Sequence, residues 1–189
     1  YVRYPIRMNI KKSVPKKDKD GNEIEGKFED VYEVETLNSM TPIWKKTRKE
    51  LKEEELNDFY KQKYYDYQDP LTHIYINVEG ALNYIALVYI PKTVPYNLYS
   101  DKYEKGLQLY TKGVFVMEKC KELVPDYLRF IRGLVDSSDL PLNISREILQ
   151  KNRNLEKIAN NVEKKIISKL ESMLKNEREK YLEFYKAFG

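Results

Sequence analysis

The sequence contains very little of what enzymes use to build nucleophilic or metal-binding sites. Among its 189 residues there is one cysteine, Cys120, and one histidine, His73. A single cysteine cannot form an internal disulfide, which favours a reducing compartment and hence a cytoplasmic location. A thiol nucleophile also needs a base beside it, and no known catalytic motif surrounds Cys120. We therefore expect no cysteine chemistry and no metal centre in this chain.

Glycine is scarce as well, and long apolar runs are missing. The seven glycines form no Gly-x-x-x-x-Gly-Lys run, which is the loop that cradles nucleotide phosphates in many ATPases. No apolar stretch approaches the roughly 18–20 residues that cross a membrane, so no membrane partner is expected. The chain opens on Tyr1, with neither an initiator methionine nor a signal peptide. We expect it to be an excised piece of a longer protein.

Charge gives only weak grounds for a nucleic-acid partner. Lysine and arginine number 34 against 30 acidic residues, for a net charge of +4. Lysine and glutamate interleave along the chain, as on a solvated surface, whereas a nucleic-acid binder gathers its cations on one face. Two alternatives stay open: a basic, tyrosine-rich nucleic-acid-binding module, and a self-contained phosphoryl-transfer enzyme. The second lacks a convincing general base, since one histidine and scattered carboxylates supply none.

Apolar periodicity predicts strands early in the chain and helices late. The expected strands cover Tyr4–Ile10, Val31–Leu37, Tyr75–Glu79, Asn83–Ile90 and Leu107–Met117. A charged connection over 11–30 would join the first two. The expected helices cover Lys49–Tyr65, Asp126–Leu134, a long apolar stripe from Leu155 to Leu174, and a short one from Tyr181 to Phe188. This order predicts an α+β fold, a mixed sheet covered by helices, with residues 1–150 as one domain and 151–189 as a helical appendage.

One stretch, Asp136–Gln150, has an unusual composition for a connector. Serines and aspartates open it, Pro141 stiffens it, and apolar residues alternate through Leu140, Leu142 and Ile144. The alternation should pin the segment to the domain, because each buried apolar side chain is worth roughly 1.5–3 kcal/mol. A pinned segment would hold Arg146 in a fixed direction. A guanidinium can donate two parallel hydrogen bonds to the oxygens of a phosphate. The residues alone also allow a simpler interpretation, a helix start capped by Asn143 or Ser145.

This stretch closely resembles the catalytic-loop segment in the middle domain of the 90-kDa heat-shock protein chaperones. Six further motifs occur in the order found in that family, so the resemblance covers nearly the whole chain. They are Tyr4-Pro5-Ile6, Thr41-Pro42-Ile43-Trp44, Asp69-Pro70-Leu71, Val78-Glu79-Gly80, Tyr89-Ile90-Pro91 and Gly113-Val114-Phe115-Val116-Met117. The sequences of residues 37–46 and 103–110 are most similar to the bacterial branch of the family.

The resemblance implies a dimeric, ATP-driven stress-response chaperone as the parent protein. ATP and Mg²⁺ would be held by a separate N-terminal domain, and a C-terminal domain would dimerise the parent. In this chain Arg146 corresponds to the arginine that reaches the γ-phosphate and Gln150 to its polar neighbour, whereas Asn143 and Ser145 would shape the loop. Its position in the sequence, and not the resemblance, suggests that Glu147 would pair with a nearby cation and orient it. The segment by itself should be inactive and bind no cofactor.

The resemblance also implies contacts with unfolded or partly folded client proteins, and possible cochaperones. Trp44, the single tryptophan, stands among cations and corresponds to a client contact of the family. Its alternative role is a packing anchor, since tryptophan is usually highly buried. Tyr96 and Tyr99 follow Pro95 in an expected loop, where exposed aromatics serve as apolar handles.

Overall fold

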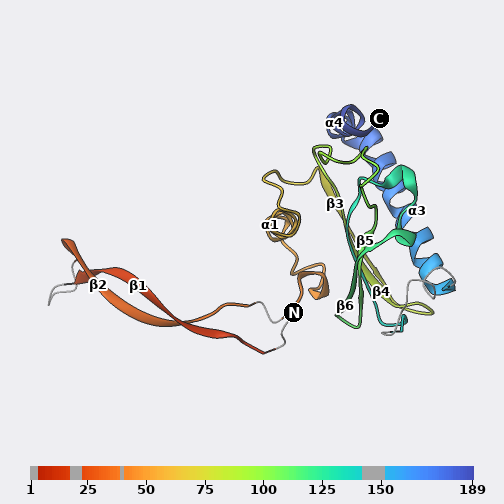
Figure 1. Ribbon diagram of the computed structural model, residues 1–189. Helices are drawn as coiled ribbons and strands as arrows, with labels where there is room; N and C mark the ends of the chain where they lie inside the picture. The colour runs from red at the N-terminus through yellow and green to blue at the C-terminus, as the bar shows by residue number, and fades with distance from the viewer. Residues whose placement is uncertain (1–3, 18–22, 39–40, 142–151) are drawn as a thin grey trace. The chain divides into compact units, whose positions relative to one another are not determined.

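The computed structural model describes residues 4–17, 23–38, 41–141 and 152–189 (Figure 1). The chain forms two compact units, residues 1–42 and 43–189. This division differs from the expected one at residue 150, because the long C-terminal helix shares a core with the sheet of the larger unit. None of the helices within the described ranges is long and apolar enough to cross a membrane.

The smaller unit is a hairpin of two long strands, β1 (Arg7–Lys17) and β2 (Glu23–Thr36). The sequence predicted shorter strands, with a loop over 11–30, and most of that expected loop is paired strand. Charge complementarity across the strands accounts for the difference. Lys11 forms an ion pair with Asp30 at 2.8 Å, and Lys12 with Glu33 at 3.1 Å. Opposite charges in diagonal positions on paired strands stabilise the pair even where apolar alternation is weak.

The larger unit is built on a five-stranded mixed sheet in the order β3-β4-β7-β5-β6. Its strands are β3 (Thr72–Val78), β4 (Tyr84–Ile90), β5 (Leu107–Thr111), β6 (Val114–Cys120) and β7 (Arg132–Ser137). Strands β5 and β7 run parallel, whereas the other three neighbouring pairs are antiparallel. The two edges of the sheet are therefore β3 and β6.

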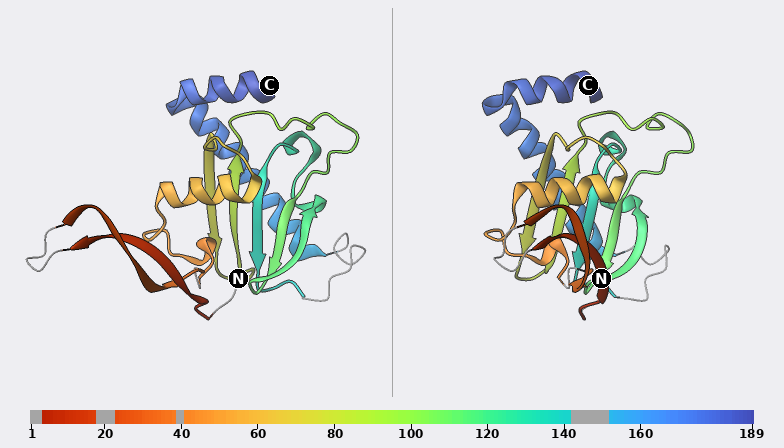
Figure 2. Two further views of the ribbon diagram at one scale, coloured as in Figure 1. Left: turned by 60° about the vertical axis from the view of Figure 1, so that its left-hand side comes forward. Right: turned by 90° about the vertical axis from the view of Figure 1, so that its left-hand side faces the viewer.

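Helices cover both faces of this sheet (Figure 1, Figure 2). On one face lie α1 (Glu53–Tyr64) and the short helix η1 (Ile43–Lys45), and on the other lies α3 (Arg153–Asn176). Helix α4 (Arg178–Phe188) follows α3, and its Phe188 ring stacks on Phe130 with centroids 4.4 Å apart. The predicted α+β fold, a mixed sheet between helical layers, is confirmed.

The inner strand β4 shows how side chains fill the core on each face of the sheet. Ala86 and Val88 belong to the core beneath α3, whereas Leu87 and Tyr89 belong to the core beneath α1. Successive side chains of a strand point to opposite faces, so a strand covered on both faces is apolar at every position. The predicted apolar stripe of α3 covers the core on its face of the sheet. Its buried residues are Leu155, Ile158, Val162, Ile166 and Met173.

Two expected elements have a different structure. The helix predicted over Asp126–Leu134 is a single 3-10 turn, Asp126–Leu128, followed by the central strand β7. Gly133 permits this strand, since a Cβ there would lie 2.4 Å from the Leu87 carbonyl oxygen of β4. The strand expected over Leu107–Met117 is a hairpin of β5 and β6. It turns at Lys112 and Gly113, both with positive φ, as a two-residue hairpin loop requires.

Candidate functional site

The end of β7 carries a buried carboxylate that joins three separate segments. Asp136 is 6% exposed. Its Oδ2 accepts a hydrogen bond of 3.1 Å from the indole Nε1 of Trp44, and its Oδ1 accepts one of 3.0 Å from the backbone N–H of Gly113. The ammonium of Lys45 lies 3.6 Å from Oδ2. These contacts partner both oxygens of the buried charge, which is what keeps such a group tolerable inside a protein.

Trp44 is a core residue. It is fully buried in η1, between the rings of Tyr110, at a centroid distance of 4.9 Å, and Phe59, at 6.1 Å. The expectation of an exposed client contact at this position is therefore corrected, and the packing-anchor alternative holds. The sequence was misleading because Lys45 and Lys46 directly follow the tryptophan. In η1 the side chains of Ile43 and Trp44 are buried, whereas Lys45 is exposed.

Beyond Asp136, the chain stays attached to the sheet for four more residues. The Oγ of Ser137 donates a 2.9 Å hydrogen bond to the carbonyl oxygen of Asn83, just before β4. The carboxylate of Asp139 accepts hydrogen bonds from the backbone N–H and the side-chain amide of Asn83. Leu140 is 1% exposed within the core beneath α3. The chain thus enters the segment 142–151 from a fixed position.

The segment 142–151 is followed by the capped N-terminus of α3. The side chain of Asn152 accepts hydrogen bonds from the N–H groups of Asn154, at 2.9 Å, and Leu155, at 3.1 Å. Asparagine at this position satisfies N–H groups that the first turn of a helix leaves without partners. The predicted phosphate-contacting residues Arg146 and Gln150, and the predicted loop residues Asn143, Ser145 and Glu147, lie outside the described residues.

Tyr96 and Tyr99 lie in the connection between β4 and β5. Both are exposed, Tyr96 fully and Tyr99 by 75%, whereas Leu98 between them is 2% exposed. The N–H of Leu98 donates a 3.0 Å hydrogen bond to the carbonyl oxygen of Pro95, which closes a turn. The buried leucine thus anchors a turn that presents two tyrosine rings to solvent. This placement agrees with the expected exposed loop, and client binding at the two tyrosines stays a prediction.

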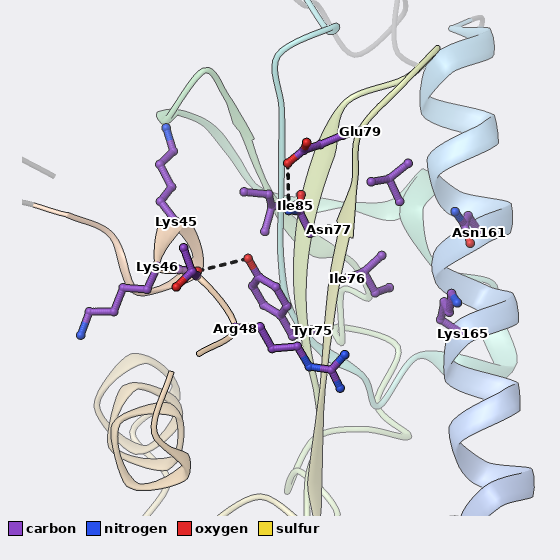
Figure 3. Close-up of a pocket in the computed structure, with 12 residues that line it drawn as sticks. Lys45, Lys46, Arg48, Tyr75, Ile76, Asn77, Glu79, Ile85, Asn161 and Lys165 are labelled. Carbon is purple, nitrogen blue, oxygen red and sulfur yellow. Dashed lines mark hydrogen bonds between the residues drawn. The ribbon is translucent and has the colours of Figure 1, made fainter. Parts of the chain in front are cut away.

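A long groove follows the edge of the sheet along β3, and we call it the β3-edge groove. It consists of two cavities of about 820 and 430 Å³ that share Arg48 and Tyr75. Figure 3 shows its larger part, with Lys45 and Lys46 on one side of β3, Asn161 and Lys165 of α3 on the other, and the Arg48 side chain in front of the strand. No group of histidine, cysteine and carboxylate side chains able to hold a metal occurs among the residues with described positions.

Sequence reasoning missed the role of Asp136 and the existence of the groove. A signal for the first was present, since Asp136 follows the apolar residues Leu134 and Val135 in a strand. A charged residue at a buried strand end needs partners, and these come from far along the chain. The groove had no signal in the sequence. Its walls come from segments more than 100 residues apart in the sequence, which come together only when the helices pack on the two faces of the sheet.

The family model described as "Hsp90 protein" matches residues 6–189. The chaperone protein HtpG of Bacillus subtilis and that of Halalkalibacterium halodurans are each 50% identical to this chain over all 189 residues, which cover 29% of each relative. The chain belongs to the Hsp90 family. It spans less than a third of the length of these curated relatives.

A solved structure supports the same placement within Hsp90 proteins. The middle domain of a putative heat shock protein from Plasmodium falciparum superposes on this chain with a TM-score of 0.69 at 32% sequence identity. The match covers 79% of this chain and 57% of that one. The fold described above is therefore the fold of an Hsp90 middle domain, and the resemblance noted from the sequence motifs is confirmed.

Proposed function

We propose that this chain is the middle segment of an ATP-driven chaperone, which completes an ATP site held by a separate N-terminal domain of the parent. Arg146 would contact the γ-phosphate once the two domains close, and Gln150 would assist it. The observation that carries the proposal is the anchoring on both sides of 142–151, by Asp139 and Leu140 before it and by the capped start of α3 after it. Membership of the Hsp90 family supports the proposed partners.

The proposed chemistry is electrostatic. During phosphoryl transfer, negative charge spreads over the γ-phosphate oxygens, and a preorganised cation there is worth several kcal/mol of barrier. Anchored loop ends reduce the reorganisation that such a cation would otherwise require. A neutral amide stabilises developing charge less than a guanidinium, so Gln150 would have the smaller effect. Mg²⁺ and the adenine pocket would belong to the N-terminal domain, and a C-terminal domain would hold the dimer together.

Client proteins would meet this segment through the turn that carries Tyr96 and Tyr99. Exposed aromatic rings on an anchored turn offer large apolar contact area at a low cost in conformational entropy. Trp44 has no part in this surface, because its ring is buried against α1 and β5.

The experiment is steady-state ATP turnover of the parent protein with Arg146→Ala, together with nucleotide titration. We expect turnover to fall on the order of a thousandfold, as for loss of a comparable cation in phosphoryl transfer, and by less if domain closure limits the rate. Nucleotide affinity should hardly change, since the contact is made mainly in the closed, reacting state. Gln150→Ala should act in the same direction but more weakly.

The matched control is Arg153→Ala, which removes an exposed arginine from the first turn of α3 and should leave turnover unchanged. The 189-residue chain alone should neither hydrolyse ATP nor bind it at micromolar concentration. Unchanged turnover in a folded Arg146→Ala parent would show that the loop assignment is wrong. Micromolar ATP binding by the isolated chain would place nucleotide contacts in this segment that the proposal does not contain.

A further inference from the structure

The two edges of the five-stranded sheet differ in how they are protected. The edge strand β6 contains Glu118 and Lys119 and is paired with β5 through shifts in register. Charges and bulges of this kind are the usual means by which proteins prevent a further strand from pairing at an edge. The edge strand β3 has none of them. Its seven residues, Thr72–Val78, include no lysine, proline or acidic residue and pair with β4 in unbroken register.

The outer side of β3 offers hydrogen-bonding groups to an incoming strand. Within the part of the chain that the structure describes, β3 pairs with β4 alone. Every second residue of an edge strand directs its N–H and C=O away from the sheet. The β3-edge groove follows these groups without a break, because His73 to Glu79 all line one or both of its cavities. At about 3.3 Å per residue, an extended segment of six or seven residues would fill it.

Two walls confine the groove on either side of the strand. One is the connection between η1 and α1, which contributes Lys46 and Arg48, and the other is α3, which contributes Asn161, Lys165 and Lys169. The α3 residues are spaced by four, so they share one face of the helix. In Figure 3, Lys46 lies on one side of β3 and Lys165 on the other, and the Arg48 side chain extends in front of the strand. A strand added at this edge would place successive side chains against opposite walls.

The walls carry more positive than negative charge. Lys45, Lys46, Arg48, Lys165 and Lys169 line the groove against Glu53 and Glu79. Three of these cations already have carboxylate partners, namely Lys45 with Asp136, Lys46 with Glu55 and Lys169 with Glu177. Arg48 and Lys165, one on each wall, form no ion pair with any residue of described position, and both are exposed. A ligand that complements the groove therefore needs carboxylates on both of its faces.

We propose that the β3-edge groove binds an extended acidic polypeptide segment, which adds to β3 as a sixth strand of the sheet. Backbone hydrogen bonds to β3 would supply affinity that does not depend on sequence, and pairing of its Asp and Glu side chains with Arg48 and Lys165 would supply selectivity. A nucleic acid fits less well, because it cannot continue a β-ladder and would bring its phosphates near Glu53 and Glu79. None of the residues that line this groove belongs to the segment 142–151, and the proposed binding does not require ATP.

The experiment uses a fluorescein-labelled peptide of sequence Val-Glu-Asp-Val-Glu-Asp-Val and the 189-residue chain, at physiological salt. We expect saturable binding by fluorescence anisotropy, with protection of β3 amides from hydrogen exchange. The variants Arg48→Glu and Lys165→Glu should each weaken binding at least tenfold. The matched controls are Lys49→Glu and Lys164→Glu, which make the same charge change one residue away, at exposed positions that do not line the groove. They should bind as the unmodified chain does.

Two further ligands separate strand addition from simple charge attraction. The same peptide with alternate backbone amides methylated keeps its charges but cannot pair along one edge, and it should bind at least tenfold more weakly. An oligo-dT of equal charge should bind more weakly than the peptide and with no difference between groove and control variants. Equal binding of the methylated peptide, tighter binding of the oligonucleotide, or equal effects of Lys165→Glu and Lys164→Glu would each overturn the proposal.

Discussion

The variant Trp44→Ala is the sharpest test of how the core between α1 and the sheet is packed. The side chain is fully buried between α1 and the sheet. A buried aromatic removes roughly 150–250 Å² from water, which at about 25 cal/mol per Å² corresponds to about 4–6 kcal/mol. Measured truncations of large aromatics in protein cores cost about 3–5 kcal/mol. We expect the free energy of unfolding to fall by that amount.

The hydrogen bond to Asp136 adds a smaller contribution that a second variant isolates. Trp44→Phe keeps an aromatic ring in the core but removes the indole N–H, so Asp136 retains only the N–H of Gly113 and the ammonium of Lys45 among these partners. Leaving a buried acceptor short of a donor costs about 1–3 kcal/mol. Trp44→Phe should therefore lie between the unmodified chain and Trp44→Ala in stability.

Urea unfolding followed by circular dichroism gives the free energy of unfolding of both variants. An unchanged slope m, the dependence of that free energy on urea concentration, shows that the unfolded states are comparable. The matched control is Tyr96→Ala, which removes a fully exposed ring and should change stability by less than about 0.5 kcal/mol. In the same set, Tyr96→Ala should weaken binding to an unfolded polypeptide. A loss below about 1 kcal/mol in Trp44→Ala, at unchanged m, would refute the buried anchor, since core truncations of this size cost several times more.

Two further predictions concern single titratable groups. Burial lowers the pKa of His73 below its ordinary value of 6.5, so the stability it contributes is complete above pH 6.5 and is lost as the pH falls through the lower folded pKa. The only histidine resonance in a proton NMR titration should have its midpoint below 6.5; a midpoint at or above 6.5, or the same acid sensitivity in His73→Gln, would contradict this. Burial, and then the nearby charge of Glu122, raise the pKa of the Cys120 thiol to about 12. Ellman's reagent at pH 8 should therefore react at once in 6 M urea but only slowly with the native chain, and rapid native labelling would show that the thiol is accessible.

Local patterns identified the helices whose burial follows one face. The stripe from Leu155 to Met173 predicts α3 because a helix repeats every 3.6 residues and only one side meets the sheet. The start of strand β7 was wrongly predicted as helix, because its burial does not follow one face. From Gly133 to Ser137 it is buried on both faces, so it shows no alternation that distinguishes a strand from a short buried helix.

The sequence by itself determined the layered α+β class, the long helix α3 and the motif of 136–150 that resembles a phosphate-contacting loop. These are properties of neighbouring residues, and they can be read over short windows. Only the tertiary structure decided that Trp44 is a core residue, because its hydrogen-bond partner Asp136 is 92 positions away along the chain. Only the tertiary structure placed Arg48 and Lys165 on opposite walls of an open strand edge. Contacts between distant segments form when the layers pack, and no local pattern of residues contains them.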